Sequence, residues 1–295
     1  MKVIMMILSF LTTLSASALT VGAYNIRNFD YDQRARIQTN KSELATLLLG
    51  LKADVLSVGE INNTREFETF LAAKLPQYGF GLSRCGGAHS QHLGFIYHKN
   101  TIELLAFSED LRLSQPGGRG TCDANSRPLA MGLFKIKSTG QRFYGMSAHL
   151  KSGSAPESIA MRIKQYAIIH SIIKDLQSNS GVKDYFLAGD LNTTEFLSRG
   201  VDYQHLTKLV ASLGLVNLTQ NASCSAYWWG GSDDGVESPA LLDHVIVSPG
   251  LIKRPIQARV HGHCQKVNCR EVPVGQLGVS YAQVSDHCPV TAVIQ

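Results

Sequence analysis

The chain alternates between short apolar runs and longer segments whose apolar residues recur at helical spacing. The apolar runs predict strands at 19–25, 55–60, 93–97, 102–107, 129–136, 143–149, 185–188, 242–247 and 290–294. Helical spacing predicts helices at 42–51, 64–75, 157–177 and 203–213, and the polar stretch 108–126 predicts a loop. Because strands and helices interleave, the pattern predicts an α/β fold in which helices cover mixed sheets.

Acids and histidines recur where predicted strands end. One apolar run closes on Glu60, another closes on His149, and the run from Tyr185 ends in Gly189-Asp190-Leu191-Asn192. Ser285-Asp286-His287 stands just before the last strand. Gly, Asp and Asn also make ordinary turns, but α/β proteins place their chemistry at such strand ends. The recurrence therefore predicts one site assembled from several strands.

These residue types suit hydrolysis of a phosphodiester, which requires a cation, an activated water and a proton donor for the leaving oxygen. Glu60 is the first candidate ligand for Mg²⁺, with Mn²⁺ or Ca²⁺ as alternatives, and Asp286 is the second. A solvated surface acid is the alternative reading of Glu60, although unpaired acids are disfavoured beside buried strands. His149 and His287 could exchange protons near neutral pH.

The N-terminus has the three parts of a secretory signal. Lys2 precedes an apolar run over 3–14, and Ala16-Ser17-Ala18 offers a cleavage site after Ala18. A membrane anchor is the alternative, but the run is shorter than the ~20 residues that span a bilayer. We therefore expect a signal peptide at 1–18, a single catalytic domain at 19–295 without a Pro/Gly/Ser-rich linker, and a secreted or periplasmic protein without stable membrane insertion.

The mildly positive net charge is compatible with a polyanionic partner, and the even number of cysteines is compatible with export, but neither feature requires it. Of 28 basic residues only Lys2 lies in the signal, which leaves 27 basic against 23 acidic residues, or +4. The six cysteines predict three disulfides, with Cys264–Cys269 as a local pair and Cys85–Cys122 as a link between loops. A zinc site at His261, His263, Cys264 and Cys269 is the alternative, which an oxidising compartment disfavours.

Six short motifs, in order along the chain, resemble the endonuclease/exonuclease/phosphatase family. They are Tyr24-Asn25-Ile26-Arg27, Val58-Gly59-Glu60, Ser147-Ala148-His149, Gly189-Asp190-Leu191-Asn192, Leu242-Asp243-His244-Val245 and Ser285-Asp286-His287. Members of this family include deoxyribonuclease I, abasic-site endonucleases, bacterial sphingomyelinases and inositol polyphosphate phosphatases. The resemblance implies a four-layer α/β sandwich, two packed mixed β-sheets flanked by helices, with the active site at one end of the sheet pair.

The resemblance also implies roles for individual residues. Asp243 would orient His287, and this dyad would activate water or stabilise the phosphorane while His149 assists at the leaving group. Asp190 and Asn192 would lie beside the scissile phosphate, with Asn25 in the same network and at the metal. Arg127 resembles the family's phosphate-binding arginine, with an ordinary loop arginine as the alternative. His244, on the opposite face of its strand from Asp243, is expected to pack in the core.

One departure from the family pattern concerns His149. Gln91 stands where deoxyribonuclease-like members carry an acid that orients the first catalytic histidine. An amide could orient His149 but could not stabilise its charged form. The calcium sites of deoxyribonuclease I have no matching acidic run in this chain.

The substrate is predicted to be nucleic acid, with DNA favoured over RNA and cut internally without strong sequence preference by a monomer. A sphingomyelinase-type phospholipase is the alternative, but residues 249–284 hold a single aromatic, Tyr281, where such enzymes carry a membrane-entering hairpin. Three roles are open for Trp228 and Trp229. They could contact lipid, which would support the phospholipase, pack in the core, or stack on a sugar or base. A non-catalytic binding module on the same scaffold is a further alternative.

Basic residues between the motifs could follow a phosphate backbone or be a scattered solvated surface: Arg27, Arg34, Arg36, Arg84, Arg119, Arg127, Lys151 and Arg162.

Overall fold

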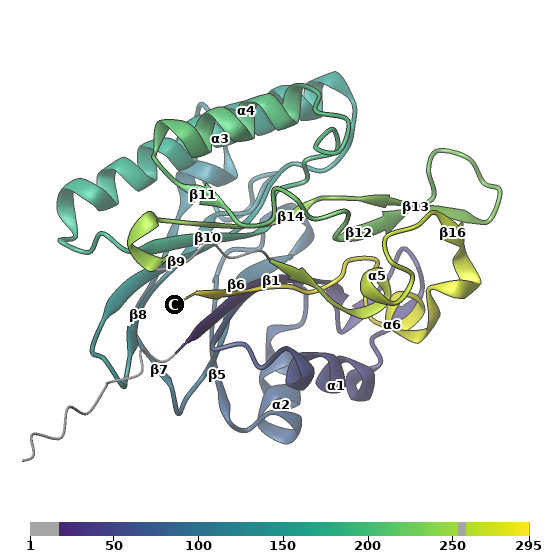
Figure 1. Ribbon diagram of the computed structural model, residues 1–295, viewed down its shortest axis with the longest axis horizontal. Coiled ribbons are helices and arrows are strands. Elements are labelled where there is room, and N and C mark those ends of the chain that lie inside the picture. The colour runs from purple at the N-terminus through teal and green to yellow at the C-terminus, as the bar shows by residue number, and fades with distance from the viewer. Residues whose placement is uncertain (1–17, 253–257, 295) are drawn as a thin grey trace, which may run out of the picture.

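Two six-stranded β-sheets pack face to face in the computed structural model, which describes residues 18–252 and 258–294 (Figure 1). Helices cover the outer face of each sheet, so the predicted four-layer α/β sandwich is confirmed. The predicted signal segment lies outside the described residues up to position 17.

The first sheet has the strand order β15-β17-β1-β4-β6-β5. Its strands are β1 (Leu19–Phe29), β4 (Val55–Ile61), β5 (Tyr78–Leu82), β6 (His92–His98), β15 (Arg259–Val260) and β17 (Val290–Ile294). β1 runs parallel to β4 and antiparallel to β17, so the first and last strands of the chain are neighbours in a mixed sheet. Strands β5 and β15 have no counterpart in the sequence-based prediction.

The second sheet has the order β11-β14-β10-β9-β8-β7. Its strands are β7 (Ile102–Asp110), β8 (Leu129–Ile136), β9 (Arg142–His149), β10 (Tyr185–Asp190), β11 (Val216–Asn217) and β14 (Asp243–Val247). β10 is parallel to β9 and antiparallel to β14, with Asp190 directly opposite Asp243. This sheet is therefore mixed as well, and its central strands carry three of the predicted site residues.

Four helices form the two outer layers. They are α1 (Lys41–Leu51), α2 (Thr64–Lys74), α3 (Pro156–Asn179) and α4 (Val201–Ser212). Helices α1 and α2 lie against the first sheet, and α3 and α4 lie against the second (Figure 1). Asn40 and Asn63 begin α1 and α2 by accepting hydrogen bonds from backbone N–H groups of the first turn. Predicted helix limits agree with the structure within two residues. No helix of the described residues is long and apolar enough to cross a membrane.

The interface between the sheets is apolar except close to the catalytic end. Phe95, Phe134, Phe143 and Phe186 pack against one another there with almost no exposure. Nearer the site, the Ser57 hydroxyl on β4 donates to Ser147 Oγ on β9 at 2.7 Å. A buried hydroxyl must find such a partner, so this contact favours one alignment of the two sheets beneath the site.

A smaller disulfide-bonded unit extends from the catalytic end. It contains the three-stranded sheet β12 (Ala226–Trp228), β13 (Val236–Ala240) and β16 (Val272–Pro273), together with helix α5 (Gly262–Lys266), which precedes β16, and helix α6 (Gly278–Gln283), which follows it (Figure 1). Strands β12 and β13 pair as an antiparallel hairpin, for which the sequence pattern predicts no strands. A further short hairpin joins β2 (Tyr31–Asp32) to β3 (Ile37–Gln38).

All six cysteines form disulfides, as predicted, but one predicted pairing is wrong. Cys85–Cys122 is confirmed, whereas Cys264 pairs with Cys288 and Cys269 pairs with Cys224. Cys264 lies inside the small apolar cluster beside Cys288, so sequence proximity to Cys269 does not decide its partner. The alternative zinc site is also wrong, because both of its cysteines are oxidised.

Candidate active site

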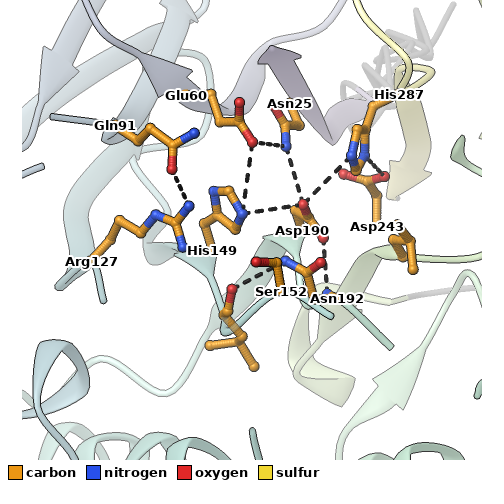
Figure 2. Close-up of polar contacts among 12 residues, drawn as sticks. Asn25, Glu60, Gln91, Arg127, His149, Ser152, Asp190, Asn192, Asp243 and His287 are labelled. Carbon is orange, nitrogen blue, oxygen red and sulfur yellow. Dashed lines mark hydrogen bonds and ion pairs between the residues drawn. The ribbon is translucent and has the colours of Figure 1, made fainter. Parts of the chain in front are cut away.

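The carboxyl ends of the parallel strands β1, β4, β9 and β10 meet at one edge of the sandwich. There they bring together Asn25, Glu60, His149 and Asp190 (Figure 2). The antiparallel neighbours β14 and β17 begin at the same edge and supply Asp243 and His287. These groups lie in or beside a cleft of about 1300 Å³.

Asp190 is the centre of the polar network. Its Oδ2 accepts a hydrogen bond from Asn25 Nδ2 at 3.1 Å and lies 3.4 Å from His149 Nε2 and 3.6 Å from His287 Nε2. Its Oδ1 accepts the backbone N–H of Asn192 at 2.9 Å. Burial raises the pKa of Asp190 to about 7. Asp190 can therefore gain or lose a proton near neutral pH.

His287 and Asp243 form the predicted dyad. His287 Nδ1 lies 2.7 Å from Asp243 Oδ2, which fixes the ring so that Nε2 faces Asp190. Burial opposes a charge on the ring, but the carboxylates of Asp243 and Asp190 hold the pKa of His287 well above its ordinary value. The imidazolium is thus the form that this site favours.

Two serines that the sequence-based interpretation overlooked fix the dyad. Ser225 Oγ donates to Asp243 Oδ2 at 2.8 Å, and Ser285 Oγ accepts the backbone N–H of His287 at 3.0 Å. Ser285 Oγ also donates to the backbone oxygen of Asn25 at 2.7 Å, which ties the last motif to the first. Ser285 stands next to the predicted Asp286-His287 pair, whereas no local signal marks Ser225.

Glu60 is held in place by two donors from β1. Its Oε1 accepts from Asn25 Nδ2 at 3.0 Å, and its Oε2 accepts the backbone N–H of Asn28 at 3.1 Å. Glu60 itself adopts a left-handed backbone conformation with φ of 59°, a strained geometry typical of functional sites. Burial, together with the nearby charge of Asp286, raises the pKa of its carboxyl group.

The acidic groups are positioned to bind a metal. Ligand atoms of Glu60, His149 and Asp190 all lie within 4.8 Å of one another, and Asp286 lines the same cleft. Carboxylate oxygens that repel one another in a buried cleft are the donors that a hard divalent cation prefers. The residues therefore fit such an ion. Asn25 presents its amide nitrogen to Glu60 and Asp190, and its oxygen accepts the N–H of Arg27 at 3.0 Å, so its role as a ligand stays a prediction.

His149 lies in the cluster but lacks the predicted orienting partner. Gln91 instead donates to Asn28 Oδ1 at 2.8 Å. It also accepts a hydrogen bond from the Arg127 guanidinium (Figure 2). Among the described residues, His149 Nδ1 has no partner, and burial lowers the pKa of the ring well below its ordinary value. The expectation that Gln91 could orient His149 is thus wrong, and Gln91 positions Arg127.

Arg127 and Asn192 border the same cleft. The Arg127 side chain is buried, and this burial lowers its pKa although Glu60 and Asp190 favour the charge. Asn192 donates one amide hydrogen to the backbone oxygen of Leu150 at 3.1 Å. Both side chains can reach a phosphate group in the cleft, and their predicted phosphate-binding role stays a prediction.

Two other expectations about charged residues have opposite outcomes. Arg162, predicted either to follow a phosphate backbone or to lie on a solvated surface, is instead fully buried in an ion pair with Asp202, so both readings are wrong. His244 packs in the core as expected, where its Nε2 lies 2.7 Å from Thr193 Oγ1. Burial lowers the pKa of His244 to about 3.

The sequence of the chain matches one known family. The endonuclease/exonuclease/phosphatase family matches residues 22–287, and the chain belongs to it. The members of this family are hydrolytic phosphoesterases. A comparison of the sequence with curated proteins finds no match.

Solved structures with the same fold come from distant sequences. An endonuclease/exonuclease/phosphatase from Bacteroides vulgatus has a TM-score of 0.65 at 17% identity, over 95% of this chain and 99% of that chain. A mannosyl-6-phosphatase from Bacteroides thetaiotaomicron has a TM-score of 0.64 at 17% identity, over 94% and 99%. TDP2 from D. rerio, complexed with single strand DNA product, has a TM-score of 0.60 at 16% identity, over 95% and 99%.

Proposed function

We propose that this protein is a divalent-metal-dependent nuclease that hydrolyses phosphodiester bonds of DNA, and of RNA less readily. The main support is the network around Asp190, in which His149 Nε2 and His287 Nε2 lie within 3.6 Å of one carboxylate oxygen. Two histidines that can transfer protons therefore face the same oxygen, Asp190 Oδ2, beside the carboxylate of Glu60. A non-catalytic binding module would have no need of this convergence.

The chain's own residues supply the proton transfers. Asp190, with a pKa near 7, accepts a proton from the attacking water at its Oδ2. His287, charged and held by Asp243, donates a hydrogen bond from Nε2 to a phosphate oxygen as negative charge develops there. His149, kept neutral by burial, accepts that proton at Nε2 from Asp190 Oδ2, 3.4 Å away, and passes it to the leaving oxygen. Arg127 and Asn192 orient the remaining phosphate oxygens.

Glu60 and Asp286 would hold the metal, with Mg²⁺ the best match to an all-oxygen donor set and Mn²⁺ or Ca²⁺ as alternatives. When bound, a divalent ion supplies charge that polarises the phosphate and stabilises the leaving oxygen. Asn25 would support Glu60 by its hydrogen bond.

A nucleic acid substrate is favoured over a lipid by the chemistry around the cleft. Arg27, Arg34 and Arg127 line it and supply positive charge for a phosphate backbone. The similar fold of a protein solved with a single strand DNA product supports nucleic acid, whereas the similar fold of a mannosyl-6-phosphatase supports another phosphoester. The exposed Trp228 and Trp229 are the observation that favours the phospholipase alternative.

A secreted or periplasmic monomer with one catalytic domain is part of the same proposal. Three disulfides require an oxidising compartment to persist. The family match extends through one continuous range, which supports a single domain.

Purified protein should be given Mg²⁺ and, in parallel, supercoiled plasmid, RNA and sphingomyelin vesicles. We expect nicking and linearisation of the plasmid, reversible loss of this activity on chelation, and loss of most of it in Glu60→Gln with an unchanged circular dichroism spectrum. Glu103→Gln, at an exposed surface acid paired with Lys135, is the matched control and should keep full activity. Release of phosphocholine with an intact plasmid would establish the phospholipase instead, and full activity in excess chelator would exclude metal dependence.

A further inference from the structure

Two exposed tryptophans stand on the wall of the catalytic cleft. Trp228 ends strand β12 and Trp229 begins the turn that leads to β13; they are 46% and 56% exposed. They are the only two tryptophans of the chain, and both line the cleft that holds Glu60, Asp190 and His287. Their indole rings are therefore not part of the apolar core, so the core-packing interpretation is wrong.

The tryptophan hairpin, residues 226–240, is directly attached to the catalytic segment. Ala226 forms an antiparallel bridge with His287, and the Tyr227 N–H donates to the backbone oxygen of Asp286 at 3.0 Å. Trp228 is two residues beyond Ala226, which places its backbone about 7 Å along the strand from this bridge. A nucleotide next to the one that reacts can bridge such a separation.

The base of the tryptophan hairpin is fixed by covalent bonds and packing. Cys224 precedes β12 and is bonded to Cys269, and Cys288 follows His287 and is bonded to Cys264. The Tyr227 ring packs among these disulfides, on the face of β12 opposite Trp228. The backbone of Trp228 is thus held at a set position relative to His287.

We propose that Trp228 and Trp229 form a stacking site for an unpaired base of the substrate, so that the protein prefers single-stranded nucleic acid, including the unpaired regions of a supercoiled plasmid, over fully paired duplex. This inference rests on the proposed nuclease function. An indole ring can stack on a base only when the face of that base is free, and in a duplex both faces are covered by neighbouring base pairs. Stacking tolerates any base, which agrees with cleavage that has little sequence preference.

Charges near the turn argue for a base over a phosphate or a membrane as the partner of the tryptophans. The turn carries Asp233 and Asp234, and Glu237 follows on β13. These acids repel phosphate and resist transfer into a bilayer, so the hairpin cannot hold the backbone of the strand or insert deeply into lipid. An uncharged aromatic base is not repelled by these acids, and its binding does not require them to enter a bilayer.

The test compares three ligands of equal length: a single-stranded oligonucleotide, its duplex, and an oligomer whose residues lack bases. Binding is measured in chelator by quenching of tryptophan fluorescence, and cleavage is measured with Mg²⁺. The variants are Trp228→Ala and Trp229→Ala, together with Trp228→Phe and Trp229→Phe. Leu197→Ala removes a side chain with 48% exposure that does not line the cleft, and serves as the control.

We expect the single strand to quench the fluorescence more strongly than the duplex. In the alanine variants the preference in kcat/KM for the single strand over the base-free oligomer should fall roughly ten- to a hundredfold, the usual size of one stacked base. The Phe variants should restore most of this preference, and Leu197→Ala should not change it.

Three outcomes would overturn the inference. They are an unchanged preference in the alanine variants, an equal loss for the base-free oligomer, and tighter binding of the duplex. If these occur while the wild-type protein cleaves nucleic acid, the proposed function stands and only the stacking site fails. If the wild-type protein neither binds nor cleaves any oligonucleotide, both fail.

Discussion

Replacing Asp202 by alanine should cost this protein a large part of its stability, although Asp202 lies outside the catalytic network. Its carboxylate receives Arg162 Nε at 2.9 Å as well as a second guanidinium nitrogen, and neither side chain is exposed. The rest of the guanidinium donates to the backbone oxygens of Lys151 and Gly153, both at 2.7 Å, and to Thr194 Oγ1 at 3.0 Å. Every N–H group of Arg162 thus has a partner.

In Asp202→Ala the charge of Arg162 stays buried without its counterion. Breaking a buried pair in this way typically costs about 3–5 kcal/mol, which is a large share of the about 5–15 kcal/mol that stabilises a domain. The folding equilibrium constant should therefore fall roughly a hundred- to several-thousandfold. Because the guanidinium also holds the segments that follow His149 and Asn192, we expect activity to fall even where the variant is folded.

Urea unfolding followed by circular dichroism measures this loss. The matched control is Asp175→Ala, which removes an acid 2.8 Å from Arg112 in a pair whose side chains are 44% and 54% exposed. Exposed pairs contribute about 0–1 kcal/mol, so the control should be nearly neutral. If Asp202→Ala and Asp175→Ala have equal effects, the reasoning about the buried charge is refuted.

Two further predictions concern neighbouring residues of β14. Asp243→Asn should leave the near-ultraviolet circular dichroism unchanged but lower kcat on the order of 10²- to 10⁴-fold, because the dyad loses the charge that holds His287; a variant with half the normal kcat would contradict this role. His244 has a folded-state pKa of about 3, below its unfolded value, so its contribution to stability is complete above pH 6.5 and is lost as the pH falls toward 3. Between pH 7 and pH 5 the wild-type free energy of unfolding should fall about 2 kcal/mol more than that of His244→Gln, as measured by urea unfolding, and equal pH dependence would exclude the buried neutral ring as the cause.

The positions of Glu60, His149 and Asp190 could be predicted from the sequence because the signal is local. Each follows an apolar run, and parallel strands end at the same edge of a sheet. The partner of His287 was predicted only through resemblance, since Asp243 lies far away in the sequence. The contact itself depends on the register of β14 against β10.

Arg162 shows where residue type misled the interpretation. It lies one helical turn from the buried residues Ile159 and Tyr166, so its position on α3 is an inward one. Arginine is seldom fully buried, and this general preference suggested a surface role. Only the tertiary placement of Asp202 on α4 makes the inward position stable.

The partners of Cys264 and Gln91 could not be predicted from the sequence either, because they too depend on tertiary structure. Cys264 and Cys269 are close along the chain, but α5 turns Cys264 toward Cys288. Gln91 was compared with a family acid at an equivalent place, yet its hydrogen bonds go to Arg127 and Asn28. Short elements between 258 and 283 have too few turns to show a periodicity, so no pattern indicated where these groups lie.

The pairing of the first strand with the last one has a consequence for the order in which the molecule can be completed. β1 carries Asn25, and its neighbour β17 directly follows the segment with His287. Of the described strands, the one that pairs last with the first sheet is thus also synthesised last, and its docking closes a loop that contains most of the described residues, with an entropic cost that grows only slowly with loop length. A partly synthesised or clipped chain can build both sheets in large part and still hold no working dyad. The dyad can thus form only after Asp243 and His287 have both been synthesised and β17 has docked against β1.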